Sequence, residues 1–202
     1  MKSLINKRLE TTITAAITAA AVTAYIQSSA DVPTAPWVGI FDPESASPEI
    51  VLVSAVTTTV EPNSITIVRG CLGTTAKAHG ADSVLYQYGE VHQMNIKITD
   101  VSTAETLYLP MPKCMVVKGM SALEATIATA DAVITLYKNA SAMSGGVITI
   151  GYDGSAAGDV DTCSPITYNE FNGTTDYLKV VNTGASTTAS VGNLTLFYVP
   201  EG

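Results

Sequence analysis

The sequence is short of charged residues. They make up 14% of its 202 residues, whereas soluble domains carry about 25%. Ten lysines and arginines against eighteen aspartates and glutamates give a net charge of −8. Because phosphate binding needs clustered cations, this balance argues against nucleic acid as the main partner. Hydrophobic residues make up 47% of the chain, enough for a core in one large or two small domains.

Cysteine, histidine and long apolar runs are also scarce. The three cysteines, Cys71, Cys114 and Cys163, form no C-x-x-C pair, which predicts free thiols rather than a disulfide framework or a thiolate zinc site. The two histidines, His79 and His92, have no metal-binding spacing, so we expect no metal and no other cofactor. No run approaches the ~20 apolar residues that span a membrane, and no membrane partner is expected.

No stretch has the spacing of a catalytic motif. No serine lies in G-x-S-x-G, and no cysteine lies in a nucleophile context. The glycine loop that follows Arg69 lacks the G-x-x-x-x-G-K-[ST] spacing of a phosphate cradle. Asp153, Asp159 and Asp161 lack the alternation and terminal glutamate of an EF-hand calcium loop. We therefore predict a non-enzymatic protein without catalytic residues.

Residues 1–30 are predicted to form an N-terminal helical arm used in assembly. Apolar residues recur there at three to four residue spacing, as on one narrow helical face. An amphipathic helix folded onto its own domain is an open alternative. The basic start and apolar middle also match a secretory leader, although Glu10 and several threonines dilute that pattern. The predicted face consists of Leu9, Ile13, Ile17, Ala20 and Ala24.

Residues 31–97 are predicted to form a small β-module. Pro33 and Pro36 indicate a linker. Glu49–Val56 has the pattern of a buried strand, and Ile65–Arg69 that of its partner across a turn. The second strand ends in a loop of small residues. Glycines there allow positive φ angles, threonines can hydrogen-bond the loop backbone, and a histidine could pin the loop.

Residues 98–202 are predicted to form a β-sandwich or a jelly-roll-like domain. Short β-patterned runs alternate with turn signals, such as Ser144-Gly145-Gly146 and Asn172-Gly173, at roughly 8–12 residue spacing. The fold class expected for the whole chain is therefore all-β with an N-terminal helical arm.

The β-module resembles one that recurs in virion proteins of tailed bacteriophages. In that family a strand of pattern E-x-V-x-V precedes T-V-x-R-G-x-x-G-T-T-A-x-x-H. The resemblance covers roughly residues 38–90, and Gly80-Ala81 departs from the expected loop register. The matching residues are Glu49, Val51, Val53, Thr66, Ile67, Arg69, Gly70, Gly73, Thr74, Thr75, Ala76 and His79.

The resemblance implies a virion structural protein that is made in the host cytoplasm and binds the major capsid protein or another virion protein. It implies a capsid decoration, cement or head-fibre protein, most simply a homotrimer. One alternative is a tail, neck or tail-fibre component with a receptor-binding C-terminal domain. An alternative of another class is a secreted carbohydrate-binding module. The residues expected to fix the shape of the module are Glu49, Thr66, Arg69, Gly70, Gly73, Thr74, Thr75 and His79.

Overall fold

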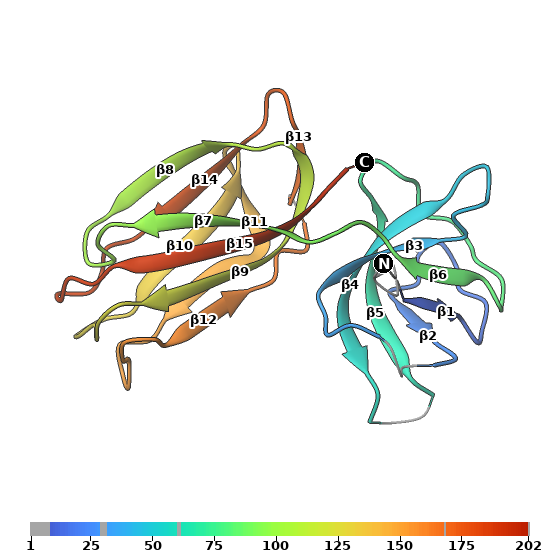
Figure 1. The fold of residues 1–202 in the computed structure, drawn as a ribbon, viewed down its shortest axis with the longest axis horizontal. Coiled ribbons are helices and arrows are strands. Elements are labelled where there is room, and N and C mark those ends of the chain that lie inside the picture. The colour runs from blue at the N-terminus through green and yellow to red at the C-terminus, as the bar shows by residue number, and fades with distance from the viewer. Residues whose placement is uncertain (1–8, 29–31, 60–61, 168, 202) are drawn as a thin grey trace, which may run out of the picture. The chain divides into compact units, whose positions relative to one another are not determined.

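The computed structural model describes residues 9–28, 32–59, 62–167 and 169–201. Within these ranges the protein is all-β, with strands β1 to β15 and no helix. The sheets are antiparallel. The chain divides into two compact units, Met1–Gly89 and Glu90–Gly202, and Figure 1 shows the strands of each.

The first unit is one six-stranded sheet in the order β1-β6-β3-β4-β5-β2. The sheet curls into a half-barrel whose edge strands are joined by backbone hydrogen bonds, from Gln27 N to Thr12 O and from Thr14 N to Tyr25 O, both 2.9 Å. Trp37 and Phe41, 2% and 0% exposed, are the largest side chains of its core. The strands are β1 (Glu10–Thr12), β2 (Thr23–Tyr25), β3 (Trp37–Phe41), β4 (Glu49–Thr57), β5 (Ser64–Cys71) and β6 (Val84–Gln87).

The helical arm predicted for residues 1–30 is wrong over its described part, and residues 1–8 and 29–30 lie outside the described ranges. β1 pairs with β6 and β2 pairs with β5, so this segment completes the half-barrel. The predicted apolar face is nevertheless buried, except for the exposed Ala20. Threonine and isoleucine, which are β-branched and favour strands, explain why the segment is extended. Its buried members are Leu9, Ile13, Ile17 and Ala24.

The second unit contains two further antiparallel sheets that share one hydrophobic core. One sheet has the order β11-β10-β14-β8, and the other has the order β12-β9-β15-β7, with β13 also paired to β9. Ile134 and Leu136 of the first sheet and Leu194 and Leu196 of the second belong to the same buried cluster. The strands are β7 (His92–Ile98), β8 (Glu105–Pro110), β9 (Lys113–Leu123), β10 (Ala132–Lys138), β11 (Ser141–Ile150), β12 (Val160–Cys163), β13 (Glu170–Asn172), β14 (Tyr177–Asn182) and β15 (Gly192–Pro200).

The predicted end of the β-module was residue 97, which lies within strand β7. This strand pairs with β15 over seven residues of register, from Ile98 opposite Gly192 to His92 opposite Tyr198. The two units are therefore divided before β7, between Gly89 and Glu90.

Candidate functional site

The densest cluster of ionisable side chains lies in the first unit, where three separate chain segments meet. Glu49 is the first residue of β4 and is 0% exposed. Arg69 lies near the end of β5, and His79 follows in the glycine loop, where it bridges to Ile17. Asp42 lies directly after β3. We call Asp42, Glu49, Arg69 and His79 the ionic clamp.

Arg69 and Glu49 form a bidentate ion pair. Arg69 Nε donates to Glu49 Oε1 and Arg69 Nη2 donates to Glu49 Oε2, each at 2.7 Å. The backbone N–H groups of Gly70 and Lys77 donate to the same carboxylate at 3.0 and 3.1 Å. Paired, charge-assisted hydrogen bonds of this kind are roughly twice as strong as neutral ones. Glu49 thereby fixes both ends of the loop between Gly70 and Lys77.

His79 lies between two carboxylates. Its Nε2 is 2.8 Å from Glu49 Oε2, and its Nδ1 is 2.8 Å from Asp42 Oδ2. The ring stacks on Phe41, with centroids 4.3 Å apart. An ionised carboxylate only accepts hydrogen bonds, so both contacts are hydrogen bonds only if both ring nitrogens donate. The buried charge of Glu49 is in any case paired with that of Arg69.

The pKa values of the two carboxyl groups agree with this charge distribution. Burial raises the pKa of Glu49, but hydrogen bonds from Arg69, His79 and the loop backbone outweigh burial and lower it to about 2. Burial also raises the pKa of Asp42, and hydrogen bonds from His79 and from the backbone of Val84 bring it below its ordinary value. Both groups are therefore ionised at neutral pH.

The ionic clamp also holds the N-terminal segment. Arg69 Nη1 donates to the carbonyl oxygens of Thr18 and Ala21 at 2.8 and 3.2 Å. Ile17 and His79 exchange two backbone hydrogen bonds, of 2.9 and 3.0 Å. The guanidinium of Arg69 thus joins strand β4, the glycine loop and the segment between β1 and β2.

Glycines and a threonine shape the loop as the sequence indicated. Gly70 and Gly73 have φ angles of 63° and 77°, in the left-handed region that glycine tolerates best. Thr74 Oγ1 donates to Cys71 O at 2.8 Å and accepts from Ile50 N at 3.0 Å. Thr66 and Thr75, the remaining predicted motif residues, are exposed and lie outside the ionic clamp.

Asp42 is a member of the site that sequence reasoning missed. Its carboxylate binds His79 and also accepts from Val84 N at 3.0 Å, which joins the end of β3 to the start of β6. In the sequence Asp42 begins a stretch with two prolines and two serines, residues typical of turns. Its φ angle of 46° is unusual for a residue other than glycine. An Asp-Pro pair directly after an apolar strand was the one available signal.

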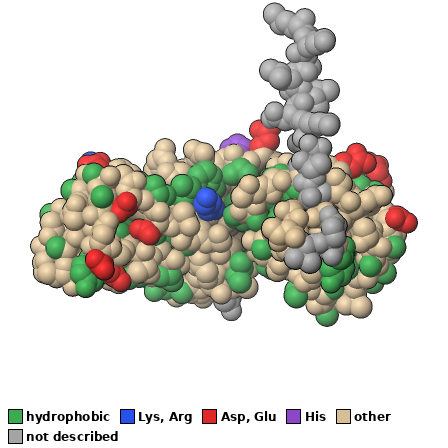
Figure 2. All heavy atoms as spheres, turned by 90° about the horizontal axis from the view of Figure 1, so that it is seen from below, with side chains coloured by type: hydrophobic (Ala, Val, Ile, Leu, Met, Phe, Trp, Pro, Cys, Tyr) green, Lys and Arg blue, Asp and Glu red, His purple; other side chains and the backbone are tan. Residues whose placement is uncertain are grey.

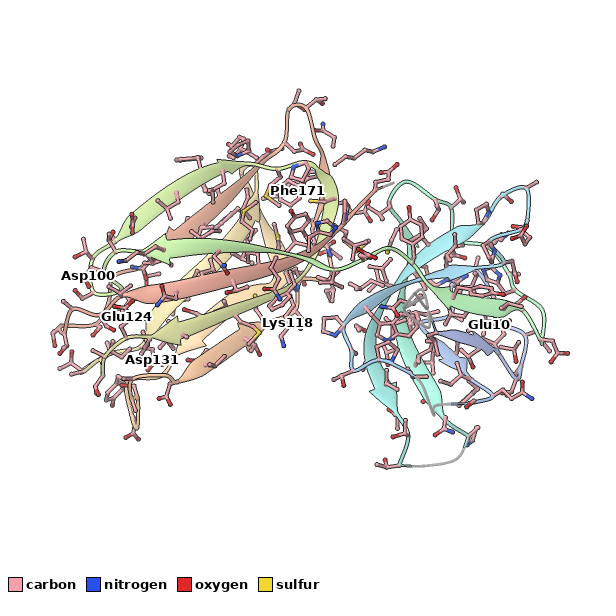
Figure 3. All side chains as sticks on the ribbon, in the orientation of Figure 1. Glu10, Asp100, Lys118, Glu124, Asp131 and Phe171 are labelled. Atoms are coloured by element: carbon pink, nitrogen blue, oxygen red, sulfur yellow. The ribbon has the colours of Figure 1, made fainter. Side chains whose placement is uncertain are left out.

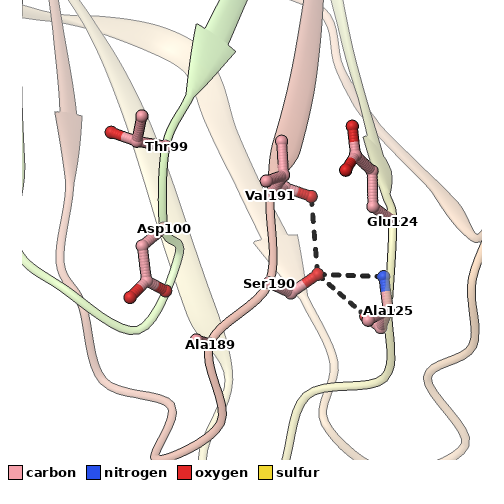
Figure 4. A pocket seen from close by; sticks show the side chains of 7 residues that line it. All are labelled: Thr99, Asp100, Glu124, Ala125, Ala189, Ser190 and Val191. Carbon is pink, nitrogen blue, oxygen red and sulfur yellow. Dashed lines mark hydrogen bonds between the residues drawn. The ribbon is translucent and has the colours of Figure 1, made fainter.

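The second unit has a surface hollow of about 390 Å³ between loops, drawn in Figure 4. Ser190 Oγ lines it, donates to Ala125 O and accepts from Ala125 N, both at 3.0 Å. The Asp100 carboxylate accepts from the backbone N–H and the hydroxyl of Ser102. The hydrogen bonds of these polar groups therefore stabilise the loops that line the hollow. The lining residues are Thr99, Asp100, Glu124, Ala125, Ala189, Ser190 and Val191.

The other residues considered from the sequence are dispersed. His92 is exposed and lies against Tyr198, with ring centroids 5.6 Å apart. Asp159 Oδ2 accepts from Ala156 N at 2.7 Å within its own turn. Among the described residues, no three His, Cys, Asp or Glu side chains gather as metal ligands. The described part of the chain also contains no helix long and apolar enough to cross a membrane. Cys71, Cys114 and Cys163 are buried thiols.

Comparison with known proteins does not assign this chain to a family. No protein-family model matches it, and no curated protein matches it.

Proposed function

We propose that this protein is a non-enzymatic structural component of a bacteriophage virion, which binds the capsid surface as a decoration, cement or head-fibre protein. In this proposal the first unit attaches to the major capsid protein or to another virion protein. The second unit, which we interpret as a β-sandwich of the jelly-roll kind, packs against sister copies in a homotrimer and faces solvent.

The observation that carries the proposal is the ionic clamp. The phage-like module was recognised from two separate stretches, one with Glu49 and one with Arg69, Gly70, Thr74 and His79. These residues meet in one network in which Glu49 accepts from Arg69, Gly70 and His79. The resemblance therefore rests on residues that share one physical task, which is to hold the glycine loop and the N-terminal segment in a fixed shape.

The chemistry of the ionic clamp favours a structural role. Both Glu49 oxygens are engaged by several donors, and His79 has a carboxylate at each ring nitrogen. A general base or nucleophile needs a free lone pair directed at a substrate. Here the same groups stabilise a surface loop, as expected of a rigid attachment module.

The sparse surface charge gives further support. Figure 2 shows charged side chains widely separated on one face of the molecule, among uncharged polar and hydrophobic ones. Interfaces between proteins are depleted of charge at their cores. Only 14% of the residues of this chain are charged, which favours a protein whose surface contacts other proteins.

Binding to capsids tests the proposal directly. Purified protein is mixed with expanded capsids that lack it, and the bound protein is measured by co-sedimentation. We expect saturable binding in a fixed ratio to the capsid protein, and weaker binding for Arg69→Ala than for Lys97→Ala, which alters an exposed side chain of β7. Absence of binding to any capsid form would overturn the proposal.

A virion map separates the capsid role from the tail or tail-fibre alternative. Density for the protein on the head lattice supports decoration, whereas density confined to the neck or the tail supports the alternative. The carbohydrate-binding alternative predicts instead a secreted chain that has lost its first residues, which intact-mass measurement detects.

A further inference from the structure

The sheet β11-β10-β14-β8 has an unusual outer face. Residues directly opposite each other on paired strands point to the same side of a sheet. Tyr108 lies opposite Lys179, which lies opposite Tyr137 on its other side. Val181 lies in the next row, opposite Thr135. The outward residues are Thr106, Tyr108, Pro110, Val133, Thr135, Tyr137, Ala142, Val147, Thr149, Tyr177, Lys179 and Val181, and we call this surface the tyrosine face.

The tyrosine face is almost free of charge. Lys179 is its one charged residue, and its Nζ lies 4.1 Å from the centroid of the Tyr137 ring. Several acidic side chains of the second unit lie in loops, and Figure 3 labels Asp100, Glu124 and Asp131 at one end of that unit. Glu105 begins β8 but lies in the row of the buried Asn182, away from the tyrosine face. The outer face of the other sheet differs, because it presents Lys97 and Lys118 among several amide side chains.

The tyrosine face also exposes large apolar groups. Tyr108 is 64% exposed, Val147 47% and Tyr177 37%. Four strands about 4.8 Å apart and about six residues long cover roughly 400 Å². This area, which includes threonines and Lys179, falls within the range of about 300–600 Å² for the largest apolar patch of a typical soluble monomer, and such a patch is often functional. Tyrosines are among the residues enriched in protein interfaces.

We propose that the tyrosine face is the surface through which copies of this chain assemble, an inference that rests on the self-association within the proposed function. Two observations favour a second copy as the occupant. The chain carries a net charge of −8, so copies repel each other through their acidic loops but meet here without an acidic side chain on either surface.

The second observation is that the two sides of the tyrosine face complement each other. The β8 and β14 side is aromatic, with Tyr108 and Tyr177 rings 5.6 Å apart. The edge strand β11 carries the aliphatic Val147 and Ala142, and Ala142 lies opposite Tyr137 of β10. Packing the aromatic side of one copy on the aliphatic side of another buries both.

A pair of matched substitutions tests this inference in the full-length protein. Val147→Asp puts a charge on the tyrosine face, and Val160→Asp puts the same charge on the outer face of the other sheet. The two valines are 47% and 51% exposed, so neither change disturbs the core. Tyr108→Asp gives a second disruption on the aromatic side. Light scattering and sedimentation report the mass of the assembly, and circular dichroism confirms that each variant is folded.

We expect wild-type protein and Val160→Asp to sediment as a multiple of 21.0 kDa, and Val147→Asp and Tyr108→Asp to sediment as monomers. A monomeric wild-type protein at about 100 µM, well above the Kd of a stable assembly, would overturn the inference. The inference would also be overturned if folded Val147→Asp still assembled or if Val160→Asp lost assembly. A monomer that binds glycans through Tyr108 would overturn it as well. Capsid binding is scored separately, so a monomer that still binds capsids contradicts only this inference, and an oligomer that binds none contradicts only the proposed function.

Discussion

Arg69 and Glu49 meet through two parallel hydrogen bonds of 2.7 Å, with both side chains removed from solvent at 7% and 0% exposure. Each charge depends on the other, because a buried charge without a partner is strongly destabilising. The same pair connects β4, β5 and the glycine loop, so its loss affects the whole first unit.

Removal of the arginine is the first prediction. Arg69→Ala should destabilise the first unit by about 3–5 kcal/mol, because Glu49 stays buried without its main partner. Trp37 is the only tryptophan and is buried in that unit, so its fluorescence during urea unfolding reports the first unit alone. Lys97→Ala, on the second unit, is the control and should leave this transition unchanged. A loss below about 1 kcal/mol, the size for an exposed ion pair, would contradict the buried pair.

Acid should weaken the first unit in a defined range of pH. The pKa of Glu49 falls from 4.5 to about 2 on folding, so the stability that it contributes is fully present above pH 4.5 and is lost as the pH falls towards 2. The shift corresponds to roughly 3 kcal/mol. Asp42, whose pKa is also lowered, acts in the same direction. Urea unfolding followed by Trp37 between pH 6 and 2.5 should show a steeper decline for the wild-type protein than for Glu49→Gln, and equal slopes would show that Glu49 does not carry the effect.

The geometry around His79 predicts that both of its ring nitrogens donate hydrogen bonds in the native protein. Both nitrogens lie 2.8 Å from ionised carboxylates, which can only accept. Nitrogen NMR of the imidazole rings tests this, with the exposed His92 as an internal reference. A neutral signal for the buried ring would mean that one of the two contacts is not a hydrogen bond.

The two loop glycines should differ in their tolerance of a side chain. A Cβ on Gly70 would lie 3.1 Å from both Ala76 N and Thr74 O, whereas a Cβ on Gly73 meets nothing within 4 Å. Gly73→Ala should therefore cost only the left-handed backbone penalty of roughly 1–2 kcal/mol. Gly70→Ala should cost measurably more by the same fluorescence-detected unfolding, and the reverse order would contradict the observed loop geometry.

Deletion of residues 1–27 should unfold the first unit and leave the second folded. The deletion removes β1 and β2 together with core side chains such as Ile13 and Ile26, which are 0% and 2% exposed. The second unit has its own core. Loss of the Trp37 transition together with retained β-sheet circular dichroism is the expected result. A native Trp37 signal in the truncated protein would show that the half-barrel tolerates the loss of both edge strands.

The central strands of the first unit could be predicted from the sequence, but its edges could not. Glu49–Val56 and Ile65–Arg69 show sustained apolar or alternating patterns, and they correspond to β4 and β5. Strands β1 and β2 have only three residues each, which is too short for a period of two to stand out. The three-to-four residue spacing of the buried isoleucines therefore resembled a helical face.

In the second unit, one turn signal was misleading. Ser144-Gly145-Gly146 was expected to be a turn, but it lies inside β11, where Gly145 has a φ angle of 73°. The ladder with β10 shifts register in this region, between Thr135 and Tyr137. A glycine within a strand often marks such a bulge. Sequence alone does not distinguish a bulge from a turn, because both need the same backbone freedom.

Three residues of the ionic clamp were named from the sequence, but Asp42 and the connections among the four were not. The phage-like pattern indicated Glu49, Arg69 and His79, yet it said nothing of Asp42 or of the carbonyl groups of Thr18 and Ala21 that Arg69 binds. Backbone acceptors have no sequence signature, because every residue has one.

Arg69 binds residues that are synthesised well before it, which fixes when the first unit can fold during synthesis. Its acceptors Thr18 and Ala21 precede it by 51 and 48 residues, and a ribosome releases them first. Until Arg69 and the following loop emerge, the N-terminal segment has neither its guanidinium nor its His79 partner. The first unit therefore cannot close before Arg69 and His79 have been synthesised, and newly made chains leave Ile13 and Ile17 uncovered until then.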